Sequence, residues 1–158
     1  MQMTHAFRAI FAAVVLTLNG PAVAEPFEDA EAAYARDDYV TALRLFRSLA
    51  DEGDATAQHR LAIMYERGLS LPQDYAQAAE WYRRAADQGH KIAQFDLAAM
   101  YETGYGVQQD YVQAYMWYNL SATQGWGAAS IGRTQLERAT PPTQIAKAQK
   151  LAREWKSR

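Results

Sequence analysis

The apolar residues of this chain recur at the spacing of amphipathic helices. One stripe occupies positions i, i+4, i+7 and i+8, which share one face of an α-helix. Its members are Ala57, Leu61, Met64 and Tyr65. Gly68 follows, where a left-handed residue is expected to end the helix. Asp74 is placed to cap a second helix with its carboxylate, and Gln77 is placed to complete a reciprocal capping box. The pattern predicts two consecutive helices joined by a loop.

The same pattern returns 36 residues later. Residues 57–90 laid over 93–126 match at 18 of 34 positions without a gap. A fixed period of this length is typical of stacked helix pairs. A shorter unit with a tighter loop precedes these two, and the match fades after residue 126. We therefore predict an all-α, right-handed solenoid of antiparallel helix pairs.

The repeated positions resemble the Sel1-like repeat, the 36-residue relative of the tetratricopeptide repeat. In the second unit the signature residues are Leu61, Tyr65, Gly68, Asp74, Ala78, Trp81, Tyr82, Ala86 and Gly89. In the third unit they are Leu97, Tyr101, Gly104, Gly106, Asp110, Ala114, Trp117, Tyr118, Ala122 and Gly125. The second unit departs from the family pattern at Ala62, Ser70 and Leu71, where the family prefers Gly, Gly and Val. These departures concern the loop conformation more than the fold.

The repeat divides the chain into five predicted parts. They are a cleavable signal peptide at 1–24, a tetratricopeptide-like helix pair at 25–54, Sel1-like repeats at 55–90 and 91–126, and a divergent helix plus a C-terminal capping helix at 127–158. The final helix is amphipathic, as the polar-faced end cap of a solenoid should be. A helix lying on a membrane surface is the alternative for it, which its modest apolar face disfavours.

Composition indicates how such helices would pack. The 158 residues include 31 Ala against 28 Ile, Leu, Val and Phe together, with 10 Tyr and 4 Trp. Small residues let helix backbones approach closely, and aromatic rings fill the space opposite them. The alanine excess is therefore expected to be the small half of a small-against-large core.

The first 24 residues have the features of an export signal. Arg8 precedes an uncharged run at 9–18, and Ala22-Val23-Ala24 forms an A-x-A cleavage site. The alternative is a retained membrane anchor, but about 20 apolar residues are needed to span a bilayer. We expect cleavage after Ala24, a mature protein in the periplasm or outside the cell, and no membrane contact after cleavage.

The chain offers little for catalysis or for ion and nucleic-acid binding. It has no Cys, so thiolate metal sites and Cys nucleophiles are excluded, and the mature part holds only His59 and His90 among histidines. Gly104-Tyr105-Gly106 lies between two helices, where it reads as a repeat loop and not as a dinucleotide fingerprint. A net charge of −2 and a pI near 5.9 argue against a nucleic-acid binder. We expect no cofactor, no metal and no enzyme activity.

A binding surface is expected on the concave wall, which first helices line in tetratricopeptide-like repeats. By their position in the repeat, the predicted partner-binding residues are Arg36, His59, Ile63, Glu66, Arg67, Phe95, Ala99, Glu102, Ile131, Gln135 and Arg138. For Phe95 and Ile131, packing between adjacent first helices is an equally good interpretation. Trp126 fits an exposed anchor less well than a residue that packs back on its own helix.

The resemblance implies an adaptor or regulator of protein complexes in the bacterial envelope, with another protein or peptide segment as its partner. Secreted Sel1-like proteins linked to β-lactam binding suggest an enzyme as one alternative. Those proteins are rich in cysteine, whereas this chain has none. The 14 Tyr and Trp residues suggest a cell-wall polysaccharide binder as another, although most of them occupy repeat core positions.

Overall fold

A computed structural model describes residues 26–157, and every regular element in this range is a helix. The helices are α1 Pro26–Ala35, α2 Tyr39–Asp51, α3 Ala55–Arg67, α4 Tyr75–Asp87, α5 Lys91–Thr103, α6 Tyr111–Thr123, α7 Gly127–Ala139 and α8 Pro142–Glu154. The predicted signal peptide at 1–24 lies outside the described residues. None of the helices between residues 26 and 157 is both long and apolar enough to cross a bilayer.

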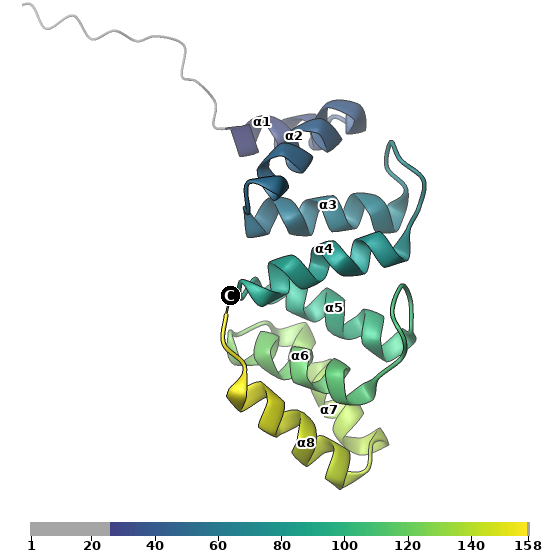
Figure 1. Cartoon of the computed structure of the whole chain (residues 1–158), viewed down its shortest axis with the longest axis vertical. Coiled ribbons are helices and arrows are strands. Elements are labelled where there is room, and N and C mark those ends of the chain that lie inside the picture. The colour runs from purple at the N-terminus through teal and green to yellow at the C-terminus, as the bar shows by residue number, and fades with distance from the viewer. Residues whose placement is uncertain (1–25, 158) are drawn as a thin grey trace, which may run out of the picture.

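The helices form one elongated stack in chain order (Figure 1). From α1 to α7, each helix packs on the helices directly before and after it. The last helix differs, because α8 packs mainly on α6. There Trp155 meets Trp117 edge to face at 6.1 Å between ring centroids, and Gln149 donates a hydrogen bond to the Tyr115 hydroxyl. The predicted all-helical repeat solenoid is confirmed, and α8 covers α6.

The core pairs small residues with large ones, as the composition predicts. Ala42, Ala78 and Ala114 occupy the same position in successive second helices, and each is completely buried. Phe46 and Tyr82 fill the space beside them with at most 1% of their surface exposed. Small residues at these positions let the helix axes lie close together.

Asp74 and Asp110 cap the second helices of the two full repeats. The Asp74 carboxylate accepts the backbone N–H groups of Ala76 and Gln77 at 2.9 and 3.0 Å. The reciprocal half of the predicted capping box is wrong, since the Asp74 N–H donates to the Tyr65 carbonyl at 2.9 Å. The last turn of α3 therefore supplies the acceptor that a Gln77 side chain would have provided.

The loops between first and second helices follow the family pattern. Gly68 and Gly104 end α3 and α5 with φ of 67° and 79°. Two residues later, Ser70 and Gly106 both have positive φ, at 58° and 72°. The departure from glycine at Ser70 therefore leaves the loop conformation unchanged.

Candidate partner-binding face

The predicted partner residues lie on or directly after the first helices α1, α3, α5 and α7, which meet along one side of the stack. Arg60 on α3 reaches back to Glu31 on α1, with 2.5 Å between Nε and Oε1 and 3.0 Å between Nη2 and Oε2. His59 on α3 reaches forward to Asp96 on α5, with 2.7 Å between Nε2 and Oδ2. We call this surface the first-helix face.

Two carboxylates on this face are held by tyrosines of the second helices. The Tyr82 hydroxyl donates to Glu66 Oε2 at 2.6 Å, and one repeat later the Tyr118 hydroxyl donates to Glu102 Oε2 at 2.7 Å. Burial, together with the acceptor carboxylates, raises the pKa of both phenols above the ordinary value. The tyrosines thus remain neutral donors, and they fix Glu66 and Glu102 as half-buried negative charges.

A small cleft opens between α3 and α5 beside these carboxylates. Its volume is about 130 Å³, and its lining residues are Glu66, Asp96, Ala99, Met100, Thr103 and Tyr105. Glu66 and Asp96 give it negative charge, and each already accepts one hydrogen bond from its own protein. The cleft is therefore a preformed acidic notch with a small floor at Ala99.

His59 is the predicted partner residue that the structure places differently. It is only 6% exposed, its ring stacks on His90 at 4.9 Å between centroids, and it bonds to Asp96. Its small exposed fraction leaves little of the ring for a partner to contact. His59 acts as a link between α3 and α5, so the prediction that it binds a partner is corrected.

His90 caps α5 with an unprotonated ring nitrogen. Its Nδ1 accepts the Ala93 N–H at 3.1 Å, in the place where Asp54 caps α3 with a carboxylate. Burial is the main cause that lowers the His90 pKa to about 4, and the neighbouring His59 adds to it, while Asp96 opposes it. The cap therefore requires the neutral imidazole.

Acidification is expected to destabilise the fold through His90. In the unfolded chain the imidazole takes up a proton near its ordinary pKa of about 6.5, whereas the folded chain resists protonation down to about 4. The unfolded state thus binds more protons between these values, and stability falls as the pH drops through this window. Because the ring is only half-buried, we expect a loss of about 1 kcal/mol after solvent screening. Urea unfolding at pH 7.5 and 5.0 measures it.

The matched control is His90→Ser, which keeps a cap acceptor but does not titrate in this range. The difference in unfolding free energy between the two pH values should shrink in this variant. An unchanged difference would assign the pH dependence to other groups.

Phe95 occupies the same repeat position as His59, and it is also turned toward the stack. Its ring lies 5.6 Å from that of Tyr118 and 6.4 Å from that of Trp126, between centroids, and it is half-buried. Trp126 is half-buried too, and its ring packs against Phe95 of α5. Both residues therefore belong to the seam between repeats.

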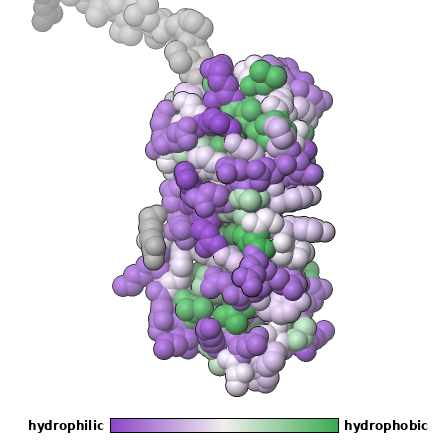
Figure 2. Space-filling model, turned by 45° about the vertical axis from the view of Figure 1, so that its right-hand side comes forward, coloured by the Kyte–Doolittle hydropathy of each residue, from purple (hydrophilic) through white to green (hydrophobic). Residues whose placement is uncertain are grey.

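The remaining predicted residues stay accessible, but they do not form one site. Ile63, Glu66, Ala99 and Glu102 are half-buried, and of these Glu66 and Ala99 line the acidic notch. Arg36 and Arg67 are exposed at the loop ends of their helices. A separate hollow of about 390 Å³ lies on α7, lined by Ser130, Ile131, Thr134, Gln135 and Arg138. Figure 2 shows one side of the molecule, on which apolar areas are separated by hydrophilic ones.

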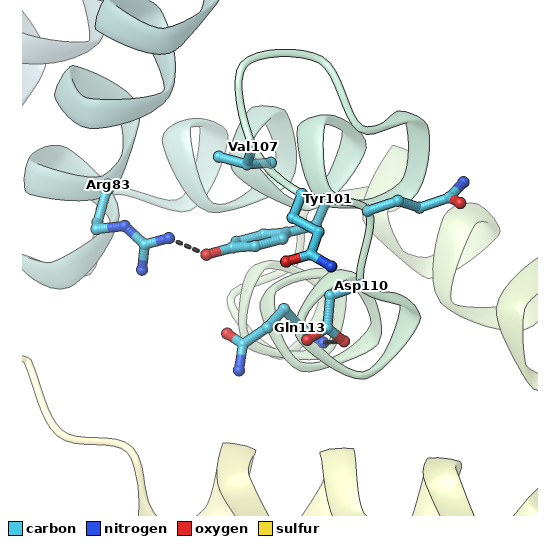
Figure 3. Close-up of a pocket in the computed structure, with 7 residues that line it drawn as sticks. Arg83, Tyr101, Val107, Asp110 and Gln113 are labelled. Atoms are coloured by element: carbon cyan, nitrogen blue, oxygen red, sulfur yellow. Dashed lines mark hydrogen bonds between the residues drawn. The ribbon is translucent and has the colours of Figure 1, made fainter.

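A larger polar pocket, of about 590 Å³, lies away from this face, between α4 and the loop that joins α5 to α6 (Figure 3). Arg83 donates a hydrogen bond to the Tyr101 hydroxyl at its edge, and Gln113 and Asp110 lie below the ring. The same pair occurs one repeat earlier, where Arg47 donates to the Tyr65 hydroxyl. This repetition assigns the pair to packing between a second helix and the next first helix.

Two surface residues escaped the sequence-based prediction. Asp96 is central to the notch and pairs with His59, and the exposed Tyr105 stacks on Tyr75 at 5.3 Å beside it. A signal for Asp96 exists in the repeat, since the equivalent position holds Arg60. A reversal of charge at one repeat position marks a contact that differs between units.

Clusters of side chains suited to bind a metal ion are not found in the described part of the chain. No group of three or more His, Asp or Glu residues between 26 and 157 is arranged to hold a metal ion. The pairing of His59 with Asp96 resembles a catalytic dyad in composition, and among the described residues no hydroxyl group is hydrogen-bonded to the His59 ring.

Stacked helix pairs with a first-helix face define a helical repeat protein of the solenoid class. The chain belongs to the Sel1 repeat family, whose model matches residues 31–54, 55–90 and 91–126. The matched range 31–54 falls within the unit predicted to be a tetratricopeptide-like helix pair. A comparison with curated proteins finds no match.

Two solved structures are similar to the chain along most of its length. One is c5321, a protective antigen present in uropathogenic Escherichia coli strains that displays an SLR fold, with a TM-score of 0.77 and 30% identity over 84% of this chain. The other is a Sel1 repeat protein from Oxalobacter formigenes, with a TM-score of 0.68 and 25% identity over 82% of this chain. The chain spans only 30% and 55% of the lengths of these two proteins.

Proposed function

We propose that this Sel1 repeat protein is a non-enzymatic adaptor or regulator in the bacterial cell envelope, which binds another protein through its first-helix face. The observation that supports this most directly is the acidic notch between α3 and α5. Glu66 and Asp96 are held in place by Tyr82 and His59, so the surface is ordered before a partner arrives. A preformed surface lowers the entropic cost of binding.

The chemistry of the notch points to a partner segment with a basic side chain. Glu66 and Asp96 bring two carboxylates to the rim, and the small Ala99 leaves room for a long side chain between them. An exported location rests on the signal-like residues 1–24. The similarity to c5321, a protective antigen, supports a role outside the cytoplasm by analogy.

Site-specific photo-crosslinking in the producing cell tests this proposal. A benzoylphenylalanine at Ala99, which lines the notch, should form an adduct with one defined protein, identified by mass spectrometry. The same probe at Gln77, exposed on α4, is the matched control and should not form that adduct. Glu66→Lys in the Ala99 probe protein should reduce the adduct about tenfold or more, because like charges repel across an interface.

Identical adducts from Ala99 and Gln77, or an adduct that Glu66→Lys does not change, would contradict the proposal. The two alternatives have their own tests on the purified protein. Turnover of nitrocefin would establish a β-lactam-hydrolysing enzyme, and sedimentation with peptidoglycan would establish a cell-wall polysaccharide binder.

A further inference from the structure

The α7 end of the stack carries a face that is covered in the two full repeats before it. His59 on α3 contacts Asp96 in the next first helix, and Phe95 on α5 contacts Trp126 at the start of α7. Ile131 is the third residue at this repeat position, but within residues 26–157 no further first helix follows α7, because α8 packs on α6. Ile131 is accordingly 63% exposed. The surface on which a following repeat would pack is therefore uncovered on α7.

A hollow lies on α7 around this exposed residue. It is about 390 Å³ in volume and is formed by the side of α7 that lies away from α6. The buried residues Ala129, Gly132 and Leu136 occupy the opposite side of the helix. An isolated helix face with an exposed isoleucine at its centre is suited to receive another helix.

The two ends of the solenoid carry opposite charge. Residues 26–54 contain eight acidic and three basic side chains, a net charge of −5, whereas residues 127–157 contain six basic and two acidic ones, a net charge of +4. Arg138 borders the α7 hollow. On the α1 end, Glu28 and Asp29 are exposed. Complementary potentials of this kind steer association and fix its orientation.

We infer that the α7 hollow receives the α1 end of a second copy of this chain, so that the molecules stack head to tail. α1 is the natural occupant because it is itself a first helix, and it brings the exposed Asp29 and the small, exposed Ala32. Arg36 at its far end is accompanied by the exposed Asp37 and Asp38, so this end also presents net negative charge to Arg138. Apolar areas near both ends of the stack are visible in Figure 2.

Head-to-tail contact uses two different surfaces of each molecule. It is a heterologous contact, which leaves one free end on each side and permits longer stacks as the concentration rises. The internal repeat joints would then continue from one molecule into the next and extend the first-helix face. The inference assigns Ile131, Gln135 and Arg138 to a second copy, and it does not depend on the proposed partner of the acidic notch.

Sedimentation velocity of the protein, purified in the form that the producing cells process, tests this inference. We expect association that rises with concentration at about 50 mM salt and weakens at about 500 mM, because salt screens the opposite charges. Ile131→Asp and Asp29→Arg should each weaken association about tenfold or more, as loss of a central contact does. Thr56→Asp, at an exposed position on α3 away from both ends, should have no effect.

Mixing the two weakened variants gives the decisive result. Ile131→Asp retains an intact α1 end and Asp29→Arg an intact α7 end, so an equimolar mixture should form a 1:1 dimer and nothing larger. Circular dichroism melting of each variant verifies that both remain folded. A mixture that stays monomeric, or wild-type protein that is monomeric at about 100 µM, a concentration suited to weak interfaces, would overturn the inference. Association of Asp29→Arg with itself as strongly as the wild-type protein would also overturn it, since Asp29 would then lie outside the contact.

Discussion

Replacement of Gly106 by alanine is expected to lower the melting temperature by about 10 °C or more. A Cβ at this position would lie 2.0 Å from the Tyr75 carbonyl oxygen and 2.4 Å from its carbon, and the residue has a φ of +72°. Backbone atoms of α4 cannot rotate away as a side chain could. The loop between α5 and α6 must therefore separate from the start of α4, at a cost of about 3 kcal/mol or more when strain and lost packing are combined.

Gly53→Ala provides the control for this prediction. Gly53 has a φ of +100°, but a Cβ there would meet no atom within 4 Å. Only backbone strain applies, and we expect a cost of about 1 kcal/mol. Thermal melting followed by circular dichroism compares the two variants. Equal losses would show that the approach of Gly106 to Tyr75 contributes nothing to stability.

The contrast between Gly106 and Ser70 shows what the sequence could predict about the loops. Both residues occupy one repeat position and both have positive φ. The left-handed backbone could be expected from the glycine in the repeat pattern. The close approach to Tyr75 could not, because it depends on how one repeat is seated on the previous one. Ser70 belongs to the loop between α3 and α4, and its side chain is exposed.

The fold was predictable because the same residue types are buried at the same positions of each full repeat. Ala78 and Ala114, and Tyr82 and Tyr118, recur at one period and take equivalent buried places. Periodic burial is visible in a sequence because a helix turns at a fixed rate. The helix bounds follow from the aspartates and glycines that stand at the same places in both units.

The candidate site was less predictable because one repeat position has three different environments. His59 pairs with Asp96, Phe95 packs on Trp126, and Ile131 is exposed. From their position in the repeat alone, these three residues are expected to have the same role. What separates them is the neighbour in the next repeat, and for Ile131 the path that α8 takes back to α6.

Because Phe95 packs against the next repeat, its replacement is expected to have a large effect on stability. Phe95→Ala is expected to lower the free energy of unfolding by about 2 kcal/mol, roughly half the cost of removing a fully buried phenylalanine, because the ring is half-buried. It removes contacts to Tyr118 and Trp126 that hold α5 to α6 and to the start of α7. Urea unfolding of the two proteins at equal concentration measures the loss.

The matched variant is Ile131→Ala, at the same repeat position one unit later. Ile131 is 63% exposed, so its truncation should change the free energy of unfolding by about 0.5 kcal/mol or less. Both measurements belong at low protein concentration, so that association between molecules does not add to the stability. Nearly unchanged stability in Phe95→Ala would return that ring to the partner surface, because a side chain that stabilises the seam between repeats cannot be removed without cost.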